Sequence, residues 1–151
     1  MSNEELKTFL PGIHPSLLFE EGTQWLTAQV EPMEMLPLAQ QLRNHAQLYF
    51  DYLFCITCVD WKTHLSMVYF FSSTKYRHTV VIKSKLNRND PQIETVSHIW
   101  KTAEFNEREI FELFGVRFSN HADLRNLILP DIWEGFPLRK DYEDPVNMIK
   151  L

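Results

Sequence analysis

The sequence of 151 residues predicts a single α+β domain, with a mostly antiparallel sheet, helices packed on one face and an extended C-terminal arm. Two observations predict the body: apolar residues alternate with a period of two in the central segments, and they recur at helical spacing in the flanking ones. A third predicts the arm, because residues 116–151 are rich in Trp, Phe, Leu and Arg but show neither period. We therefore assign residues 1–115 to the α+β domain and residues 116–151 to a partner-docking arm.

The first part of the chain is expected to form two helices and one strand. A short helix is predicted over residues 4–10, ending before Pro11. Residues 25–31 are predicted as a strand and residues 33–45 as a helix, in which Pro37 is tolerated in the first turn. The apolar positions that predict them are Leu26, Ala28 and Val30 in the strand and Met35, Leu36, Leu38, Ala39 and Leu42 in the helix.

Three strands are expected in the middle of the chain. Residues 49–59 are a nearly unbroken apolar run, which predicts a buried strand. Residues 65–72 and 77–86 alternate as half-buried strands do, and the short polar link of residues 73–76 predicts an antiparallel hairpin. Their expected buried faces consist of Leu65, Met67, Tyr69 and Phe71, and of Val80, Ile82 and Leu86.

Two helices are expected after the turn-forming residues 87–91. The first spans residues 93–103, where apolar residues recur at spacings of three and four. The second begins at Asn106 as its N-cap, with Glu109 as the capping-box partner, and ends at Gly115.

The sequence offers little evidence of a cofactor site. Cys55 and Cys58 have the spacing of a redox or metal-binding pair, but three positions along a strand place them on opposite faces, and the chain has only two cysteines. We interpret both as small buried core residues. The six histidines are scattered, and none of the four glycines lies in a nucleotide-binding loop. We therefore expect no cofactor to be bound by this chain.

Charge and hydropathy restrict the partners. A formal net charge of −5 argues against nucleic acid. No apolar run approaches the roughly 18–20 residues that cross a bilayer, so direct membrane insertion is not expected. The acidic start of the chain lacks the features of a signal peptide, which predicts a cytoplasmic location.

The charged cluster of Glu107, Arg108, Glu109 and Glu112 has more than one interpretation. Glu109 and Glu112 share a helix face, as in carboxylate metal sites. The cluster is also typical of a helix start, with Arg108 paired to Glu112 one turn later. A third interpretation is a small enzyme that uses the glutamates and His121 as acid and base. In the arm, arginines stand between aromatic and aliphatic residues, a composition typical of protein interfaces.

The region of residues 106–142 resembles a known family. Its signature contains Glu107-Arg108-Glu109, the run from Glu112 to Phe118, His121, Leu124-Arg125 and Ile128-Leu129, and it resembles the C-type subunit of respiratory complex I, the proton-pumping NADH:quinone oxidoreductase. The same signature is found in the mitochondrial 30 kDa subunit, and residues 129–142 resemble that family's C-terminal segment. The chain departs from the family pattern at Ala122, Asn126 and Phe136.

The resemblance implies a non-catalytic structural and assembly subunit of the peripheral arm, with no active site of its own. It implies docking on the D-type subunit, which helps form the quinone cavity, and proximity to the B-type subunit, on the cytoplasmic face of the inner membrane. NADH, FMN, iron–sulfur clusters and quinone would all be held by other subunits. The partner-interface residues expected here are Glu107, Arg108, Glu109, His121, Arg125, Trp133, Phe136, Leu138, Arg139 and Lys140.

An alternative within the family is the homologous subunit of a membrane-bound hydrogenase or a related dehydrogenase complex. A freestanding enzyme or binding module is the alternative from another class.

Overall fold

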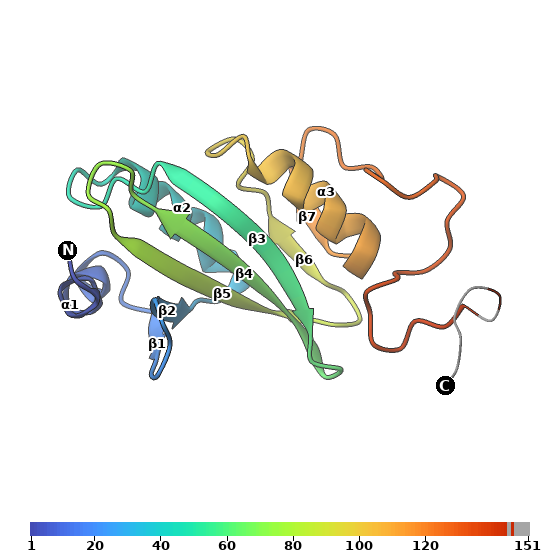
Figure 1. Cartoon of the computed structure of the whole chain (residues 1–151), viewed down its shortest axis with the longest axis horizontal. Coiled ribbons are helices and arrows are strands. Elements are labelled where there is room, and N and C mark those ends of the chain that lie inside the picture. Colours follow the sequence, from blue (N-terminus) through green and yellow to red (C-terminus); the bar gives the residue numbers. More distant parts are fainter. Residues whose placement is uncertain (145, 147–151) are drawn as a thin grey trace.

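A five-stranded sheet with the strand order β1-β2-β5-β4-β3 forms the centre of the computed structural model, which describes residues 1–144 and residue 146 (Figure 1). Neighbouring strands are antiparallel except for β2 and β5, which are parallel. The α+β fold and the mostly antiparallel sheet predicted from the sequence are therefore confirmed. The strands are β1 Leu18–Glu20, β2 Leu26–Gln29, β3 Tyr52–Asp60, β4 His64–Ser72 and β5 Thr79–Asn87.

The remaining elements are three α-helices, a short 3-10 helix and a second, two-stranded parallel sheet, all within the described residues. The helices are α1 Asn3–Ile13, η1 Pro32–Glu34, α2 Met35–Asn44 and α3 Ala103–Phe114, and the second sheet consists of β6 Gln92–Glu94 and β7 Arg117–Ser119. Residues 145 and 147–151, the end of the predicted arm, lie outside the described residues.

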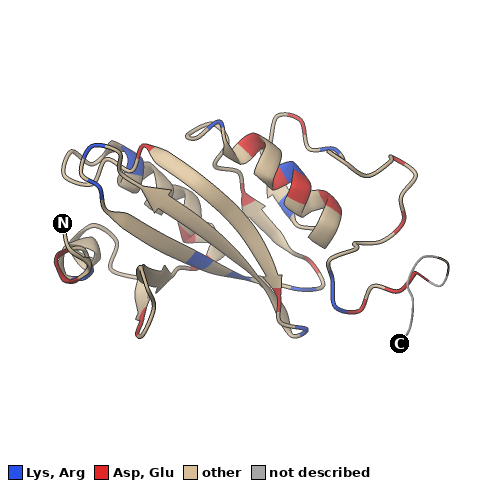
Figure 2. Cartoon of the chain, viewed as in Figure 1, with Lys and Arg blue, Asp and Glu red and all other residues tan. Residues whose placement is uncertain are grey.

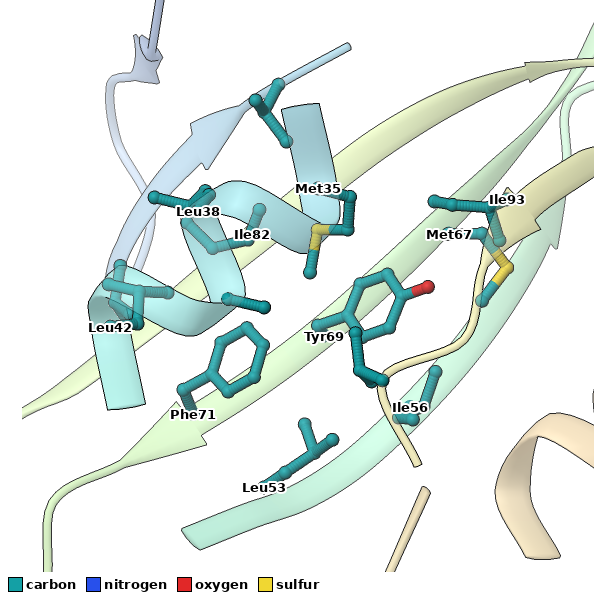
Figure 3. Packing of buried hydrophobic residues seen from close by; sticks show 14 of the residues in the cluster. Met35, Leu38, Leu42, Leu53, Ile56, Met67, Tyr69, Phe71, Ile82 and Ile93 are labelled. Carbon is teal, nitrogen blue, oxygen red and sulfur yellow. The ribbon is translucent and has the colours of Figure 1, made fainter. Parts of the chain in front are cut away.

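The hydrophobic core lies between one face of the large sheet and the helices. The alternation predicted for β4 and β5 is confirmed, because Leu65, Met67, Tyr69 and Phe71 are fully buried together with Val80 and Ile82. Figure 3 shows α2 lying across these strands with Met35, Leu38 and Leu42 directed at Tyr69, Phe71 and Ile82. Burial of this apolar surface is the main term that stabilises the domain.

The N-terminal helix is longer than predicted. A capping box between Ser2 and Glu5 starts α1, and the helix continues through Pro11 to Ile13, whereas the prediction ended it before Pro11. The helical hydrogen bonds continue beyond the proline, because the N–H of His14 donates to the carbonyl of Leu10 at 2.9 Å. Pro11 therefore removes one hydrogen bond only, near the end of the helix. The edge strand β1 was not predicted.

Strand β3 alternates rather than being buried throughout. It starts at Tyr52, and a bulge between Leu53 and Cys55 shifts the register of its pairing with β4. Cys58 faces the core and Cys55 is only partly buried, so the prediction of opposite faces is confirmed and the prediction of two buried residues holds for Cys58 alone. Burial raises the pKa of the Cys58 thiol to about 12.

The helix predicted for residues 93–103 is wrong. Residues 92–94 form β6, turns follow, and α3 begins at Ala103 rather than at an N-cap at Asn106. The helical spacing of Ile93, Val96, Trp100 and Ala103 correctly indicates that these residues are buried. It does not indicate a helix, because a strand and turns bring them to their buried positions.

The segment before α3 protects the open edge of β3. The indole Nε1 of Trp100 donates to the carbonyl of Phe50 at 3.0 Å, and the hydroxyl of Thr102 donates to the carbonyl of Leu53 at 2.8 Å. The second bond satisfies a carbonyl on the edge of β3 that would otherwise be free to pair with another strand, and the first satisfies a carbonyl just before β3. Both bonds also fix α3 beside β3.

Candidate partner interface

Of the predicted arm, residues 120–144 follow strand β7, and from this point "the arm" means these residues. The arm runs past α3 at the end of the molecule opposite the N-terminus (Figure 1). The predicted end of the helix at Gly115 is confirmed, because Gly115 adopts the left-handed conformation with φ of 76°. The segment that follows is not wholly aperiodic, since β7 pairs with β6, and Val116 and Phe118 are buried in the core. Figure 2 shows acidic and basic residues along α3, on the helix that the arm passes.

His121 holds the start of the arm on α3, beside the buried Glu107. The Glu107 carboxylate is fully buried and accepts hydrogen bonds from the Thr95 hydroxyl and, at 2.9 Å, from the N–H of Val96. Burial raises its pKa to about 7. The buried imidazole of His121 accepts the N–H of Asp123 at Nδ1, so Nε2 carries the proton. This nitrogen donates to the carbonyl of Glu104 at 3.1 Å and lies 3.7 Å from Glu107.

Arg108 and Glu112 hold the backbone of the arm from one face of α3. The guanidinium of Arg108 donates to the carbonyls of Arg125 and Asn126 at 3.2 and 3.0 Å. The Glu112 carboxylate accepts the N–H groups of residues 127, 128 and 129 at 2.8–3.1 Å. The pairing predicted between Arg108 and Glu112 is wrong, because each side chain binds the arm instead.

The later part of the arm caps the C-terminus of α3. The N–H of Leu138 donates to the carbonyl of Leu113 at 3.1 Å, and Nε of Arg139 donates to the carbonyl of Phe114 at 2.6 Å. These are carbonyls that a helix end leaves without partners, and a cation is favourable there. The Arg139 guanidinium also lies 4.9 Å from the ring centre of Phe136.

A buried ion pair ties the arm to the sheet. Arg88 donates two hydrogen bonds to the Asp60 carboxylate, at 3.0 and 2.8 Å, and two more to Asp141. Asp60 also accepts the N–H of Lys140 at 2.8 Å. The hydrogen bonds from Arg88 hold the pKa of Asp60 well below its usual range. Asp60 at the end of β3 and Arg88 just after β5 therefore fix residues 140–141.

Many apolar side chains of the arm nevertheless point away from the body. Ile128 is 70% exposed and Ile132 is 90% exposed. Leu127, Trp133 and Leu138 are also exposed, and Phe136 is partly exposed although its ring lies against Gly115. An apolar surface of this kind on a folded domain is typical of a site for another macromolecule.

The ten residues predicted for the interface fall into three groups. Glu107, Arg108 and the His121 side chain are buried inside the chain itself, where they bind the arm or its neighbours. Glu109 and Arg139 are half-buried, and Arg125 is exposed and paired with Asp123. The remaining four are exposed: Trp133, Phe136, Leu138 and Lys140. Their contact with a partner stays a prediction.

Three residues of this region were missed. Glu112 was recognised as part of the charged cluster but not as a residue that binds the arm, and its place one turn after Arg108 is the signal that points to it. Asp60 and Arg88 meet only in the tertiary structure.

Within the described residues, no three His, Cys, Asp or Glu side chains gather as a metal site would require. None of the helices formed by the described residues combines the length and apolar character that a membrane crossing requires.

The fold and this region define an α+β domain with an attached arm whose apolar side chains face outward. A family model described as the 30 kDa subunit of respiratory-chain NADH dehydrogenase matches residues 28–146. The chain belongs to this family.

Several curated relatives, all subunits of NADH-quinone oxidoreductase, are similar to the chain. It is 42% identical over 114 residues to the C/D-type subunit from Phocaeicola vulgatus, and this alignment covers 74% of this chain and 22% of the relative. It is 38% identical to the C-type subunit from Chloroherpeton thalassium, over 68% of this chain and 43% of the relative. It is 39% identical to the C-type subunit from Chlorobium phaeobacteroides, over 70% and 66% of the two chains. The chain therefore spans less than two thirds of the length of each of these relatives.

Two solved structures share the fold. A chain of the membrane-bound sulfane sulfur reductase, an archaeal respiratory membrane complex, aligns with a TM-score of 0.72 at 22% identity, over 93% of this chain and 85% of that one. A trypsin-resistant fragment of Nqo5, residues 1–134, aligns with a TM-score of 0.61 at 23% identity, over 79% of this chain and 98% of the fragment. At these identities the likeness concerns the fold alone.

Proposed function

We propose that this protein is the C-type subunit of a proton-translocating NADH:quinone oxidoreductase and that it is a structural and assembly subunit without an active site of its own. Membership of the 30 kDa subunit family and the names of the relatives support the proposal. NADH, FMN, iron–sulfur clusters and quinone are then held by other subunits. The chain lies in the peripheral arm of the complex, on the cytoplasmic face of the membrane.

We further propose that the C-terminal arm docks on the D-type subunit, which contributes to the quinone site, and that the B-type subunit lies close by. One observation carries this docking: the arm is bound to α3 through its backbone while its apolar side chains, such as Ile128 and Ile132, face outward. Relatives named C/D join the two subunit types in one chain, which supports the D-type subunit as the neighbour. The alternative complex, of the hydrogenase or dehydrogenase type, is not favoured, because the respiratory membrane complex that shares the fold is named a sulfane sulfur reductase.

The proposal is tested by purifying the tagged chain with its native complex from solubilised membranes and identifying the other subunits. We expect the D-type and B-type subunits together with an NADH-oxidising flavoprotein. Hydrogenase subunits in their place would favour the alternative, and recovery of the chain alone would contradict both.

Lysine cross-linking then locates the contact. Lys140 lies in the arm, and Lys75 is another exposed lysine, on the β4–β5 hairpin. We expect cross-links from Lys140 to the D-type subunit and none from Lys75. The reverse pattern would place the D-type subunit on the opposite end of the molecule.

A further inference from the structure

We propose that residues 127–133 form a preformed apolar docking loop, and that Glu112 and Arg108 are positioning residues that lock its backbone before any partner is bound. The loop fits an apolar recess on a protein neighbour, with a basic residue at the rim of the recess. The inference rests on the proposed function, in which that neighbour is the D-type subunit.

The lock is built around the Glu112 carboxylate. Its side chain is buried, with the residue 3% exposed, and its two oxygens accept the N–H groups of Leu127, Ile128 and Leu129. Three consecutive N–H groups converge on one acceptor only when the backbone curls around it, as in other anion-binding turns. Hydrogen bonds to an ionised acceptor are about twice as strong as neutral ones, so the Glu112 carboxylate stabilises this backbone conformation of residues 127–129.

Arg108 completes the lock from the same helix face. It donates to the carbonyls of Arg125 and Asn126, immediately before the three N–H groups that Glu112 binds. The two side chains stand one helical turn apart. Arg108 binds carbonyl groups of the arm and Glu112 binds its N–H groups, so both kinds of backbone group have partners on α3. Since these backbone groups of residues 125–129 are bound by α3, the side chains that follow from Leu127 onward are what the loop offers to a partner.

The loop is anchored on both sides. Before it, the imidazole Nε2 of His121 donates to the backbone carbonyl of Glu104 in α3 at 3.1 Å, and after it Leu138 and Arg139 bind the C-terminal carbonyls of α3. Ile132 is 90% exposed in the span between these anchors. A loop already fixed in this way loses less conformational entropy on binding than a free tail.

The side chains of the loop identify the kind of partner. Leu127, Ile128, Ile132 and Trp133 are exposed and apolar, which suits an apolar recess. Asp131 and Glu134 are exposed beside them, so a basic group at the rim complements the loop. The same carboxylates disfavour an anionic lipid surface or nucleic acid.

The experiment tests separately whether Glu112 fixes the backbone of the loop and whether the apolar side chains of the loop contact the partner. Glu112→Gln keeps the size of the side chain but removes its charge, and Glu31→Gln makes the same change at an exposed residue outside α3 and the arm. The double variant Ile128→Ser/Ile132→Ser removes apolar contacts, and Met33→Ser, at a residue 88% exposed on η1, is its control. All are made in the full chain. Amide hydrogen exchange of residues 127–129 is measured by NMR in the free chain, and the dissociation constant is measured with the purified D-type subunit.

We expect Glu112→Gln to accelerate exchange of the three amides and to weaken binding, each by roughly tenfold or more. The double isoleucine variant should weaken binding by a similar factor while leaving exchange unchanged. Both controls should match the wild type in both measurements.

Three results would overturn the inference. The first is exchange of the wild-type amides at the rate of an unstructured chain. The second is release of these amides by Glu112→Gln without any loss of affinity. The third is unchanged affinity in the double isoleucine variant. If the wild type does not bind the D-type subunit but its amides are protected, the proposed docking fails together with the partner assignment, and only the lock stands.

Discussion

The ring of Phe136 lies directly over Gly115, so that a β-carbon built on this glycine would be 2.6 Å from the ring atom Cζ. Gly115 also has φ of 76°, a conformation that disfavours residues with side chains. One position therefore both ends α3 and leaves room for the arm to return to the helix end. This contact couples the order of the arm to the end of the helix.

Gly115→Ala is expected to destabilise the protein and to displace Phe136. The left-handed backbone costs about 1–2 kcal/mol for a residue with a β-carbon, and the close ring adds to this unless it moves away. Urea unfolding followed by circular dichroism measures the loss. Gly12→Ala is the control, because Gly12 lies in α1 with open space around it, and alanine should leave stability unchanged or raise it by about 1 kcal/mol. Equal effects of the two substitutions would contradict the proposed role of Gly115.

Glu107→Gln is expected to change how stability depends on pH. An unfolded glutamate ionises near 4.5, whereas burial raises the folded pKa to about 7, so the folded state binds the extra proton between these values. Wild-type stability should therefore fall as pH rises from about 4.5 to 7, by up to about 3 kcal/mol. Glutamine imitates the protonated form and should remove this part of the fall. Unfolding free energies at pH values of about 5, 6 and 8 measure it, with the exposed Glu31→Gln variant as control. Parallel pH profiles for wild type and Glu107→Gln would refute the expectation.

Asp60→Asn is expected to be strongly destabilising. Its buried carboxylate is paired with Arg88, and removing one partner of a buried ion pair costs about 3–5 kcal/mol. Because the pKa of Asp60 is held low, its stabilisation is fully present above the pKa of an unfolded aspartate, about 3.9, and is lost progressively below it. Thermal unfolding measures the change. Asp141→Asn should cost clearly less than Asp60→Asn, because Asp141 is largely exposed, and a larger cost there than at Asp60 would contradict the assignment.

The two cysteines are expected to differ in reactivity. Burial raises the pKa of Cys58 to about 12, so the thiolate that reacts with thiol reagents is nearly absent at a pH of about 8. Cys55 is partly buried and should react slowly in the folded protein. Titration with an aromatic disulfide reagent should modify Cys55 in the native state and Cys58 only after unfolding. Cys55→Ser should then abolish labelling of the folded chain, and persistent labelling of this variant would show that Cys58 is accessible.

Much of the body could be predicted because its pattern is local. The alternation in β4 and β5 depends on neighbouring residues along each strand, and the fully buried Met67 and Ile82 follow from it. The end of α3 at Gly115 is likewise a property of one residue type. The stripe of α2 is a third example, since Met35, Leu38 and Leu42 meet the sheet as their spacing requires.

The errors occurred where pairing partners are distant. Strand β6 is only three residues long and exists because β7, far along the chain at Arg117–Ser119, pairs with it, so the spacing of Ile93 and Val96 alone suggested a helix. Strand β1 depends in the same way on β2. Strands this short carry too little periodicity to be recognised without their partners.

The sequence by itself determined the fold class, the buried faces of the long strands, the limit of the last helix and the resemblance to the family, because each of these depends on residue types at short, regular spacing. Only the tertiary structure decided what the charged cluster binds. Arg108 and Glu112 are suitably spaced to pair with each other, yet each instead binds the backbone of residues 125–129, whose carbonyl and N–H groups need partners. Near a buried site, satisfying those backbone groups stabilises the structure more than a single pair of side chains would.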